Sequence, residues 1–294
     1  MSVFIGVDGG GTGCRAIAAD AEGNHLGSGK SGPANIMTGY SAAISNIVEA
    51  CSKAVIDAGL SVDQLSAANV YLGLAGANIG DYARKMKEAL PFKRCSIETD
   101  AMMALQGAIG DADGVVAVIG TGSVFIYRRN GIIRTAGGWG FTVGDLGSGS
   151  RLGRSLLQET LLSFDGIIEG SELTRYILSN FENDPQTIVE YAHTAKPGEF
   201  GKFAPLIFKY AKTGDPTAET ILQNAVDDIE ATLDAILADG NQHLCMLGGL
   251  GEKYSKLIGD RFTSIMCDPI GDSASGALSL AVRNYSKHQE YGVV

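Results

Sequence analysis

The chain has 294 residues, 45% of them hydrophobic and 19% charged, and its net charge is −10. At about 100–200 residues per domain, this length predicts two domains with enough buried surface to fold without disulfides or structural metals. The acidic balance argues against binding to nucleic acid or to an anionic membrane, because both require a basic surface. No run of about 18 apolar residues occurs, so no membrane-spanning helix is expected.

The cysteines and the N-terminus indicate a cytoplasmic protein. The five cysteines are widely spaced and form no C-x-x-C pair, so neither a disulfide framework nor a zinc site is expected. They stand at positions 14, 51, 95, 245 and 267. We interpret them as small buried side chains in a reducing compartment. The N-terminal residues lack the basic and long apolar segments of a signal peptide.

The first 109 residues predict a sheet with helices on its faces. Strands are expected at residues 3–7, 15–19, 25–28, 70–74 and 95–98. Apolar residues at helical spacing predict helices at residues 40–59, 81–90 and 101–109. The first three strands form a β-meander, and the later strands are separated by helices, which is typical of parallel strand pairs.

An apolar strand, a glycine-rich turn and two further strands then occur a second time. The strands of this copy are expected at residues 115–119, 124–127 and 132–136, with the turn at 120–123. We interpret the recurrence as an internal duplication; two unrelated hairpins are the alternative. The rest of the chain predicts helices at 151–164, 171–181, 185–194, 200–212, 216–238, 252–259 and 273–285, and strands at 243–247 and 264–267. No proline- or serine-rich linker interrupts it, so residues 110–114 are expected to be a hinge between packed domains.

Two glycine motifs resemble nucleotide-binding sequences and are rejected. The run Gly29-Lys30-Ser31 matches the end of a P-loop, but Asn24 replaces the earlier glycine, and Gly32-Pro33 would stop the required helix. The run from Gly11 to Ala16 fits G-x-G-x-x-A, but residues 15–19 continue as a strand. No helix N-terminus is therefore available there for a pyrophosphate.

Two glycine turns remain as candidate phosphate sites. The first follows Asp8 at the end of a buried strand and comprises Gly9, Gly10, Gly11 and Thr12. The second comprises Gly120, Thr121, Gly122 and Ser123. Backbone N–H groups in such turns can surround an anion, and an aspartate at a strand end can hold Mg²⁺ directly or through water. Because the turns fall at equivalent positions of the duplicated unit, we expect them to hold a phosphate chain across a cleft.

The sequence resembles a known superfamily over nearly its whole length. The matching blocks are Gly6-Val-Asp-Gly-Gly-Gly-Thr12, Gly32-Pro-Ala-Asn35, Gly73-Leu-Ala-Gly76, Glu98-Thr-Asp100-Ala, Gly120-Thr-Gly-Ser123, Gly137-Gly-Trp-Gly140 with Gly144-Asp145, Leu247-Gly-Gly-Leu-Gly251, and Asp268-Pro. This ordered set resembles the ASKHA superfamily of sugar kinases, Hsp70 and actin. Within it, the chain resembles the BadF/BadG/BcrA/BcrD ATPase family, and most closely its amino-sugar kinases, N-acetylglucosamine kinase and bacterial glucosamine kinase.

The resemblance implies an α/β, two-domain actin-like ATPase (ribonuclease H-like) fold with an interdomain cleft. Each domain would hold a mixed sheet flanked by helices. The first domain is expected at residues 1–110 plus about 272–294, because the closing helix returns to it, and would form the sugar and phosphate side. The second, at residues 111–271, would carry a helical insertion and form the nucleotide side.

The resemblance also implies ATP and Mg²⁺ as cofactors and gives each block a role. Asp100 follows a strand and opens a helix, and it would be the base that takes the proton of the accepting hydroxyl. Asp8 would position Mg²⁺, and the two glycine turns would hold the phosphates. The adenosine would lie at Gly248, Gly249 and Gly251. The amino sugar would contact Asn35, Gly76, Gly137, Gly138, Trp139 and Asp145.

Several of these positions also have a purely structural interpretation. Asp100 can complement a helix N-terminus, and Asp145 can cap one. Trp139, the only tryptophan, can be a core aromatic, and residues 248–251 can be a plain strand-to-helix turn. Leu146 stands where these kinases often carry an acidic residue, which leaves the identity of the sugar open.

We expect an ATP-dependent amino-sugar kinase that phosphorylates the 6-hydroxyl of glucosamine or N-acetylglucosamine. The alternative is a nucleotide-binding, ATPase-type regulator without sugar kinase activity. Relatives that transfer electrons bind an iron–sulfur cluster through cysteines, but no cysteine here lies in a glycine-rich bridging loop. The expected partners are an amino sugar and ATP, with no nucleic acid and no membrane, and the resemblance implies a homodimer.

Overall fold

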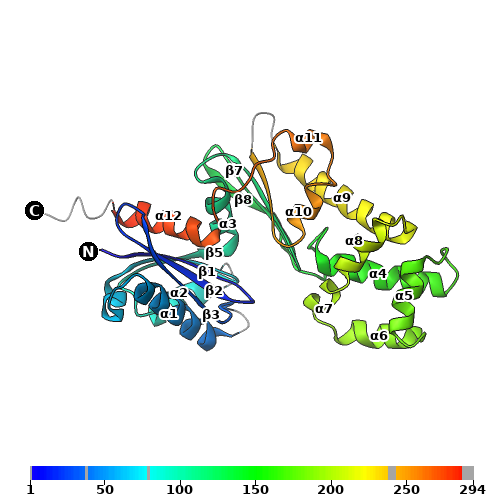
Figure 1. Ribbon diagram of the computed structural model, residues 1–294, viewed down its shortest axis with the longest axis horizontal. Coiled ribbons are helices and arrows are strands. Elements are labelled where there is room, and N and C mark those ends of the chain that lie inside the picture. The colour runs from blue at the N-terminus through cyan, green and yellow to red at the C-terminus, as the bar shows by residue number, and fades with distance from the viewer. Residues whose placement is uncertain (1, 37–38, 78–79, 238–242, 287–294) are drawn as a thin grey trace, which may run out of the picture. The chain divides into compact units, whose positions relative to one another are not determined.

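The chain folds into two compact units, each with its own sheet (Figure 1). The computed structural model describes residues 2–36, 39–77, 80–237 and 243–286. The first unit comprises Met1–Ala112 and Asp268–Val294, and the second comprises Asp113–Cys267. Two predicted segments, 216–238 and 272–294, end outside the described residues, at residue 238 and from residue 287 onward. Within the described part of the chain, no helix is both long and apolar enough to cross a bilayer.

The first unit is built on a mixed sheet with the strand order β3-β2-β1-β4-β5. β1 pairs antiparallel with β2 and parallel with β4, which in turn pairs parallel with β5. The strands are β1 (Phe4–Gly9), β2 (Cys14–Ala19), β3 (His25–Ser31), β4 (Asn69–Leu74) and β5 (Arg94–Thr99). The helices are α1 (Tyr40–Asp57), the 3₁₀ helix η1 (Val62–Ala67), α2 (Tyr82–Ala89), α3 (Asp100–Ile109) and α12 (Ser273–Ser286).

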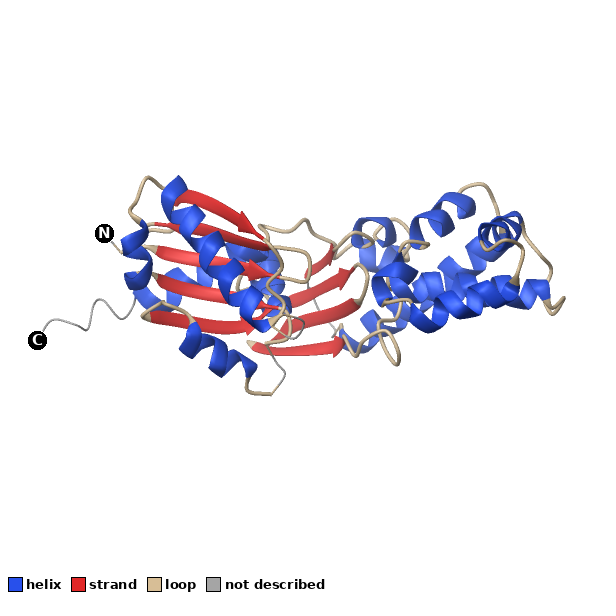
Figure 2. Cartoon of the chain, turned by 90° about the horizontal axis from the view of Figure 1, so that it is seen from below, coloured by secondary structure: helices blue, strands red, loops and turns tan. Residues whose placement is uncertain are grey.

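Both faces of this sheet are buried, because successive residues of a strand point to opposite faces. Ile5 and Val7 of β1 join the apolar cluster that includes α1, whereas Phe4 packs with α12. Figure 2 shows the strands side by side with helices over both faces. The parallel strands β1, β4 and β5 therefore all end at one edge of a fixed sheet, which we call the carboxyl edge.

The second unit repeats this strand arrangement, with the order β8-β7-β6-β9. β6 pairs antiparallel with β7 and parallel with β9, so β6 and β9 stand in the places of β1 and β4. The strands are β6 (Gly114–Ile119), β7 (Ser123–Arg129), β8 (Ile132–Gly137) and β9 (His243–Leu247). The helices are α4 (Gly149–Phe164), α5 (Glu172–Asn180), α6 (Pro185–Thr194), α7 (Pro197–Gly201), α8 (Ala204–Ala211), α9 (Pro216–Ile236), α10 (Gly251–Tyr254) and α11 (Asp260–Thr263).

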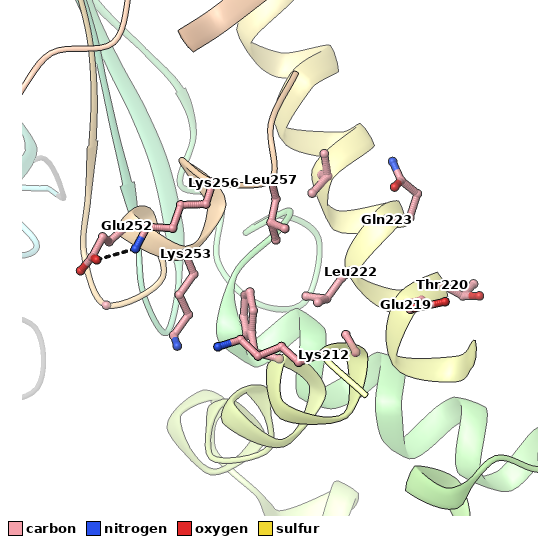
Figure 3. A pocket seen from close by; sticks show the side chains of 13 residues that line it. Lys212, Glu219, Thr220, Leu222, Gln223, Glu252, Lys253, Lys256 and Leu257 are labelled. Carbon is pink, nitrogen blue, oxygen red and sulfur yellow. Dashed lines mark hydrogen bonds and ion pairs between the residues drawn. The ribbon is translucent and has the colours of Figure 1, made fainter. Parts of the chain in front are cut away.

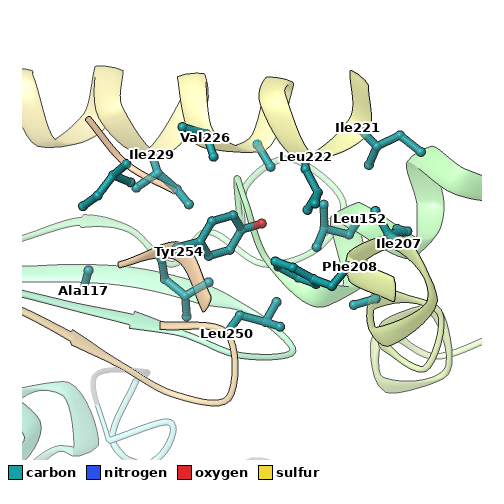
Figure 4. Packing of buried hydrophobic residues seen from close by; sticks show 14 of the residues in the cluster. Ala117, Leu152, Ile207, Phe208, Ile221, Leu222, Val226, Ile229, Leu250 and Tyr254 are labelled. Atoms are coloured by element: carbon teal, nitrogen blue, oxygen red, sulfur yellow. The ribbon is translucent and has the colours of Figure 1, made fainter. Parts of the chain in front are cut away.

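Tyr254 lies at the centre of the helical core of the second unit (Figure 4). Its ring is fully buried and packs edge-on against Phe208, with 5.8 Å between the ring centroids. Its hydroxyl donates to the Gly147 carbonyl at 2.7 Å, and burial raises the pKa of Tyr254, which keeps the hydroxyl protonated. This bond ties α10 to the loop that precedes α4.

Three predicted elements of the second unit are wrong in detail. The predicted helix 200–212 is divided into α7 and α8, because Pro205 at the start of α8 has no N–H to continue the first helix. The predicted helix 252–259 ends early, since α10 stops at Tyr254. No strand is described at 264–267, where Met266 forms a single parallel bridge with Leu244 of β9.

The short helices η1 and α11 have no apolar period by which the sequence could indicate them.

We expect Tyr254→Phe to lower the free energy of unfolding by about 0.5–1.5 kcal/mol, because the Gly147 carbonyl loses its donor while the ring packing is kept. Denaturant unfolding measures this loss as a lower midpoint concentration with an unchanged m-value, the slope of the unfolding free energy against denaturant concentration. Tyr176→Phe is the control, because Tyr176 is exposed. A loss no larger than in the control would contradict the role of the hydroxyl.

Candidate active site

The glycine turn after β1 is fixed by backbone hydrogen bonds at the carboxyl edge of the first sheet. The Gly10 N–H donates to the Gly13 carbonyl at 2.9 Å and closes the turn. The Gly9 carbonyl accepts from Ala75, which follows β4, and the Gly10 carbonyl accepts from Ala34, which follows β3, both at 2.9 Å. The turn therefore joins the ends of three strands.

The glycine turn after β6 is fixed in the same way in the second unit. The Gly120 N–H donates to the Gly122 carbonyl at 2.9 Å. The Ile119 carbonyl accepts from Leu250, after β9, at 3.0 Å, and the Gly120 carbonyl accepts from Gly149, after β8, at 2.8 Å. The recurrence in the sequence thus extends to the hydrogen bonds, which favours a duplication over two unrelated hairpins.

Asp100 lies at the carboxyl edge of the first sheet, as the first residue of α3 directly after β5. Thr99 caps the helix, since its hydroxyl accepts from the Met102 N–H at 3.2 Å. Oδ1 of Asp100 accepts from the Ala101 N–H at 2.9 Å, so this carboxylate also complements the helix start. This placement follows from the local sequence, because β5 must end at the N-cap residue Thr99 before α3 can begin at Asp100.

The surroundings of Asp100 suit a general base. Burial raises the pKa of its carboxyl above the ordinary 3.8. The Ala101 N–H opposes this rise, and the negative charge of Asp8 adds to it. A carboxylate whose pKa is moved toward neutral accepts a proton more effectively during a reaction.

Arg15 and Asp272 belong to the same edge, although the sequence pattern does not indicate a role for either. Arg15 stands opposite Asp8 in the β1–β2 register, and its Nη2 lies 2.6 Å from Asp8 Oδ2. Its Nη1 lies 2.9 Å from Asp272 Oδ2. Asp272 also accepts from the N–H of Ser275 in the first turn of α12, at 2.9 Å. Arg15 thus holds two carboxylates, and its bond to Asp8 raises the pKa of the guanidinium.

The carboxylates at this edge fit a magnesium ion held largely by water and phosphate oxygens. Among the residues that the structure describes, no group of three or more His, Cys, Asp or Glu side chains could enclose a metal. Mg²⁺ commonly keeps several waters and takes one or two carboxylates together with substrate phosphates. Asp8, 18% exposed and beside the glycine turn, suits that mode of binding.

Asn35 and Gly76 lie at the same edge as Asp8 and Asp100. The neighbours of Asn35 are both fixed, since Ala34 is bonded to the glycine turn and the Ile36 N–H donates to the Ala75 carbonyl at 3.1 Å. Gly76 follows Ala75 directly, and its φ of +86° favours glycine there. The fold of the first unit therefore brings together all the predicted site residues that belong to it.

In the second unit, the loop before α4 folds against the glycine turn. The Asp145 side chain is largely buried, and a Cβ on Gly122 would lie 2.9 Å from its Oδ2. The Ser123 hydroxyl donates to the Leu146 carbonyl at 2.7 Å. Because Ser148 is the N-cap of α4, the interpretation of Asp145 as a helix cap is wrong. Asp145 instead lies against the predicted phosphate turn.

Trp139 lies on an exposed loop of the second unit. Its side chain is 79% exposed, so the interpretation as a core aromatic is wrong. Gly137 and Gly138 lead into this loop with φ near +73° and +72°, and the Gly138 N–H donates to the Ser123 carbonyl at 3.0 Å. The loop that carries these predicted sugar contacts is therefore hydrogen-bonded directly to the second glycine turn.

A cavity of about 850 Å³ in the second unit includes the turn after β9 (Figure 3). Its wall contains Gly249, apolar side chains such as Phe208 and Leu222, and the lysines Lys212 and Lys253. The Lys253 Nζ lies 5.1 Å from the centroid of the Phe208 ring. The wall also carries Lys256, Glu219 and Glu252, so the cavity combines apolar surface with charged groups of both signs, a combination common in small-molecule sites. The lysines are site candidates that the sequence pattern does not indicate, because Lys212 directly follows α8 and Lys253 belongs to α10, far along the chain.

Comparison with known proteins decides the family. Residues 5–281 match the BadF/BadG/BcrA/BcrD ATPase family. The chain belongs to this family. It is 36% identical over 282 residues to the glucosamine kinase of Vibrio cholerae. The aligned region covers 96% of each chain. It is 27% identical over 266 residues to the N-acetyl-D-glucosamine kinase of Dictyostelium discoideum, which covers 80% of this chain and 79% of that one.

A solved structure supports the same assignment for this BadF/BadG/BcrA/BcrD ATPase. The crystal structure of a Chromobacterium violaceum protein, provisionally assigned as N-acetylglucosamine kinase, superposes with a TM-score of 0.86 at 33% identity. It covers 96% of this chain and 99% of that one. The predicted family and the predicted fold class, with a mixed sheet and flanking helices in each unit, are confirmed.

Seven of the eight glycines of the predicted nucleotide site in this ATPase fall into two groups, and Gly10 belongs to neither, since a Cβ there would lie 4.0 Å from the Gly13 carbonyl oxygen. In the first group, the protein's own packing disfavours a Cβ: at Gly9, Gly248 and Gly251 it would lie within 3.0 Å of an atom of the fold, and at Gly122 the Asp145 carboxylate would have to shift. At Gly248, for example, φ is +86° and a Cβ would lie 2.3 Å from the Ile119 carbonyl oxygen. In the second group, a Cβ would meet no described atom within 4 Å: Gly11, Gly120 and Gly249. The fold leaves room for a side chain at these three, so packing within the protein does not explain glycine there.

We expect Gly11→Ala to weaken nucleotide binding by about tenfold or more, because the new Cβ would occupy the space of a phosphate oxygen. The melting temperature should stay the same or rise slightly, since alanine restricts the unfolded chain. Gly248→Ala is the matched control and should lower the melting temperature. Isothermal calorimetry with ATP measures the binding, and wild-type affinity in Gly11→Ala would contradict the assignment of the turn.

Proposed function

We propose that this ATPase is an amino-sugar kinase that transfers the γ-phosphoryl group of ATP to the 6-hydroxyl of glucosamine or N-acetylglucosamine. The observation that carries the proposal is the partly buried carboxylate of Asp100, which lies at the carboxyl edge with Asp8 and the first glycine turn. The named activities of the two relatives support the class of substrate.

Each group of residues has one task in the proposed reaction. The backbone of the two glycine turns holds the phosphates, and the cavity beside Gly249 takes the adenosine. Asp100 accepts the proton of the sugar hydroxyl as the phosphoryl group leaves ATP. Arg15 orients the Asp8 carboxylate and offsets the negative charge at this edge. Phosphoryl transfer depends mainly on positioning and charge stabilisation, which these fixed elements supply.

Mg²⁺, when bound, would neutralise charge on the β- and γ-phosphates, and Asp8 is the residue that we assign to it. We assign the sugar to Asn35 and Gly76 of the first unit and to Gly137, Gly138, Trp139 and Asp145 of the second. The homodimer implied by the family resemblance stays a prediction.

A panel of sugars tests the proposal directly. ADP release is measured with ATP, Mg²⁺ and each of glucosamine, N-acetylglucosamine, glucose and mannose. We expect release that depends on a hexosamine, and phosphorus NMR of the product should show the phosphate on the 6-position. Release without any sugar dependence would favour the nucleotide-binding regulator instead.

The variant Asp100→Asn tests the base. We expect kcat to fall by about 10²–10⁴-fold, because the proton acceptor is lost. ATP affinity should change little, since the glycine turns bind the phosphates. A kcat within threefold of wild type would reject Asp100 as the base.

The melting temperature of Asp100→Asn is a second, independent readout. The pKa of Asp100 is raised in the folded protein, so its protonated form favours folding and this stabilisation is lost as the pH rises through the folded pKa. At pH 7 the ionised carboxylate therefore opposes folding, and the neutral asparagine removes that opposition while its oxygen can keep the Ala101 bond. The melting temperature at pH 7 should equal or exceed that of wild type, and a lower value would indicate a structural role.

A further inference from the structure

Cys245 and Cys267 lie side by side in the second unit. Cys245 belongs to β9, and residues 265–267 run parallel to this strand. The Leu244 N–H donates to the Ile265 carbonyl at 2.9 Å, and the Cys267 N–H donates to the Leu244 carbonyl at 3.0 Å. Leu244 and Met266 form a parallel bridge, so the two cysteines are the next pair along. Their Sγ atoms are 3.0 Å apart.

The parallel bridge beside this pair gives the backbone a spacing that suits a disulfide. Neighbouring strands lie about 4.7–4.9 Å apart, which falls within the Cα separation of about 4.4–6.8 Å that a disulfide spans. The two sulfurs are already in contact, so bond formation requires them to approach by only about 1 Å. The hydrogen bonds on either side of Leu244 hold the segments in this register.

We infer that Cys245 and Cys267 form a reversible disulfide when the protein meets a peroxide. Cys267 is partly exposed and Cys245 is buried, so the peroxide reaches Cys267 first. The Cys267 thiol gives up its proton, its sulfur attacks one peroxide oxygen and the O–O bond breaks; the departing hydroxide takes up that proton, so the products are a sulfenic acid and water. The Cys245 sulfur then attacks this sulfenyl sulfur, the S–S bond forms, the S–O bond breaks, and the hydroxyl leaves with the Cys245 proton as water. In total, two thiols and one peroxide give a disulfide and two waters.

The other three cysteines provide internal controls. Cys14, Cys51 and Cys95 are buried in the first unit. Burial raises the pKa of Cys14 and of Cys95 to about 12, and it also raises the pKa of Cys51. A buried thiol that stays protonated is a poor nucleophile toward peroxide. Oxidation should therefore select the pair in the second unit.

The position of the pair gives the disulfide a structural consequence. Cys267 is the last residue of the second unit, and Asp268 and Pro269 precede Ile270, whose N–H donates to the Ala108 carbonyl of the first unit at 2.9 Å. The disulfide would fasten the end of the second unit to β9, the strand that leads into Gly248. We expect slower amide exchange at 243–247 and 264–267 and a higher melting temperature after oxidation, because the closed ring restricts the unfolded chain.

Mass spectrometry of the whole protein tests this inference. Brief treatment with hydrogen peroxide should remove about 2 Da, the two thiol hydrogens, and dithiothreitol should restore the mass. Peptide mapping without reductant should recover one linked pair, containing Cys245 and Cys267. The melting temperature of the oxidised protein should exceed that of the reduced protein.

Two variants complete the test. Cys267→Ser should abolish the mass loss, whereas Cys95→Ala, the control, should keep it. The inference is overturned if the wild-type protein loses no mass, if the linked peptides contain another cysteine, or if Cys267 gains about 32 Da as sulfinic acid without cross-linking. Mapping of the wild-type protein decides the question even if a variant does not fold.

Discussion

The structure of each unit depends on one set of backbone hydrogen bonds at the carboxyl edge of its sheet. In each unit, a glycine turn follows the first strand. The two carbonyl groups at the start of this turn accept hydrogen bonds from N–H groups in the segments that follow two other strands. These carbonyls lie among buried strands, where an unpaired carbonyl would cost about 1–3 kcal/mol. The same plan in both units means that the protein's own backbone hydrogen bonds hold each turn in place.

This edge also explains why carboxylates gather in the first unit. Asp8 is the next-to-last residue of β1 and Asp100 directly follows β5, so parallel pairing through β4 brings both to the carboxyl edge of the sheet. Burial of two like charges is unfavourable, and the pKa of Asp100 rises as a result. Arg15 offsets part of this cost through Asp8 and Asp272. Carboxyl groups with raised pKa values are common at sites where a protein binds a cation or accepts a proton.

Much of this arrangement can be predicted from the sequence. The apolar runs give the strands, the glycine turns mark their ends, and Thr99-Asp100 after a strand indicates a capped helix. Contacts between distant residues cannot be found in this way: Arg15 and Asp272 are 257 residues apart. The sequence predicts a strand at 264–267, but this segment lies at the edge of the sheet and pairs with β9 through one bridge, which is too little pairing for a strand. The exposure of Trp139 depends on the path of a loop with positive φ at Gly137, Gly138 and Gly140, which an apolar pattern does not indicate.

The carboxyl titration of Asp100 tests the central claim, that Asp8 and Asp100 share one charged, partly buried edge. Carbon-13 NMR of labelled aspartate, with Asp100→Asn to assign the signal, gives this pKa in the wild-type protein and in Asp8→Asn. The account predicts a pKa above 3.8 in the wild type and a lower value in Asp8→Asn. A wild-type pKa at or below 3.8, or one that Asp8→Asn leaves unchanged, would contradict it.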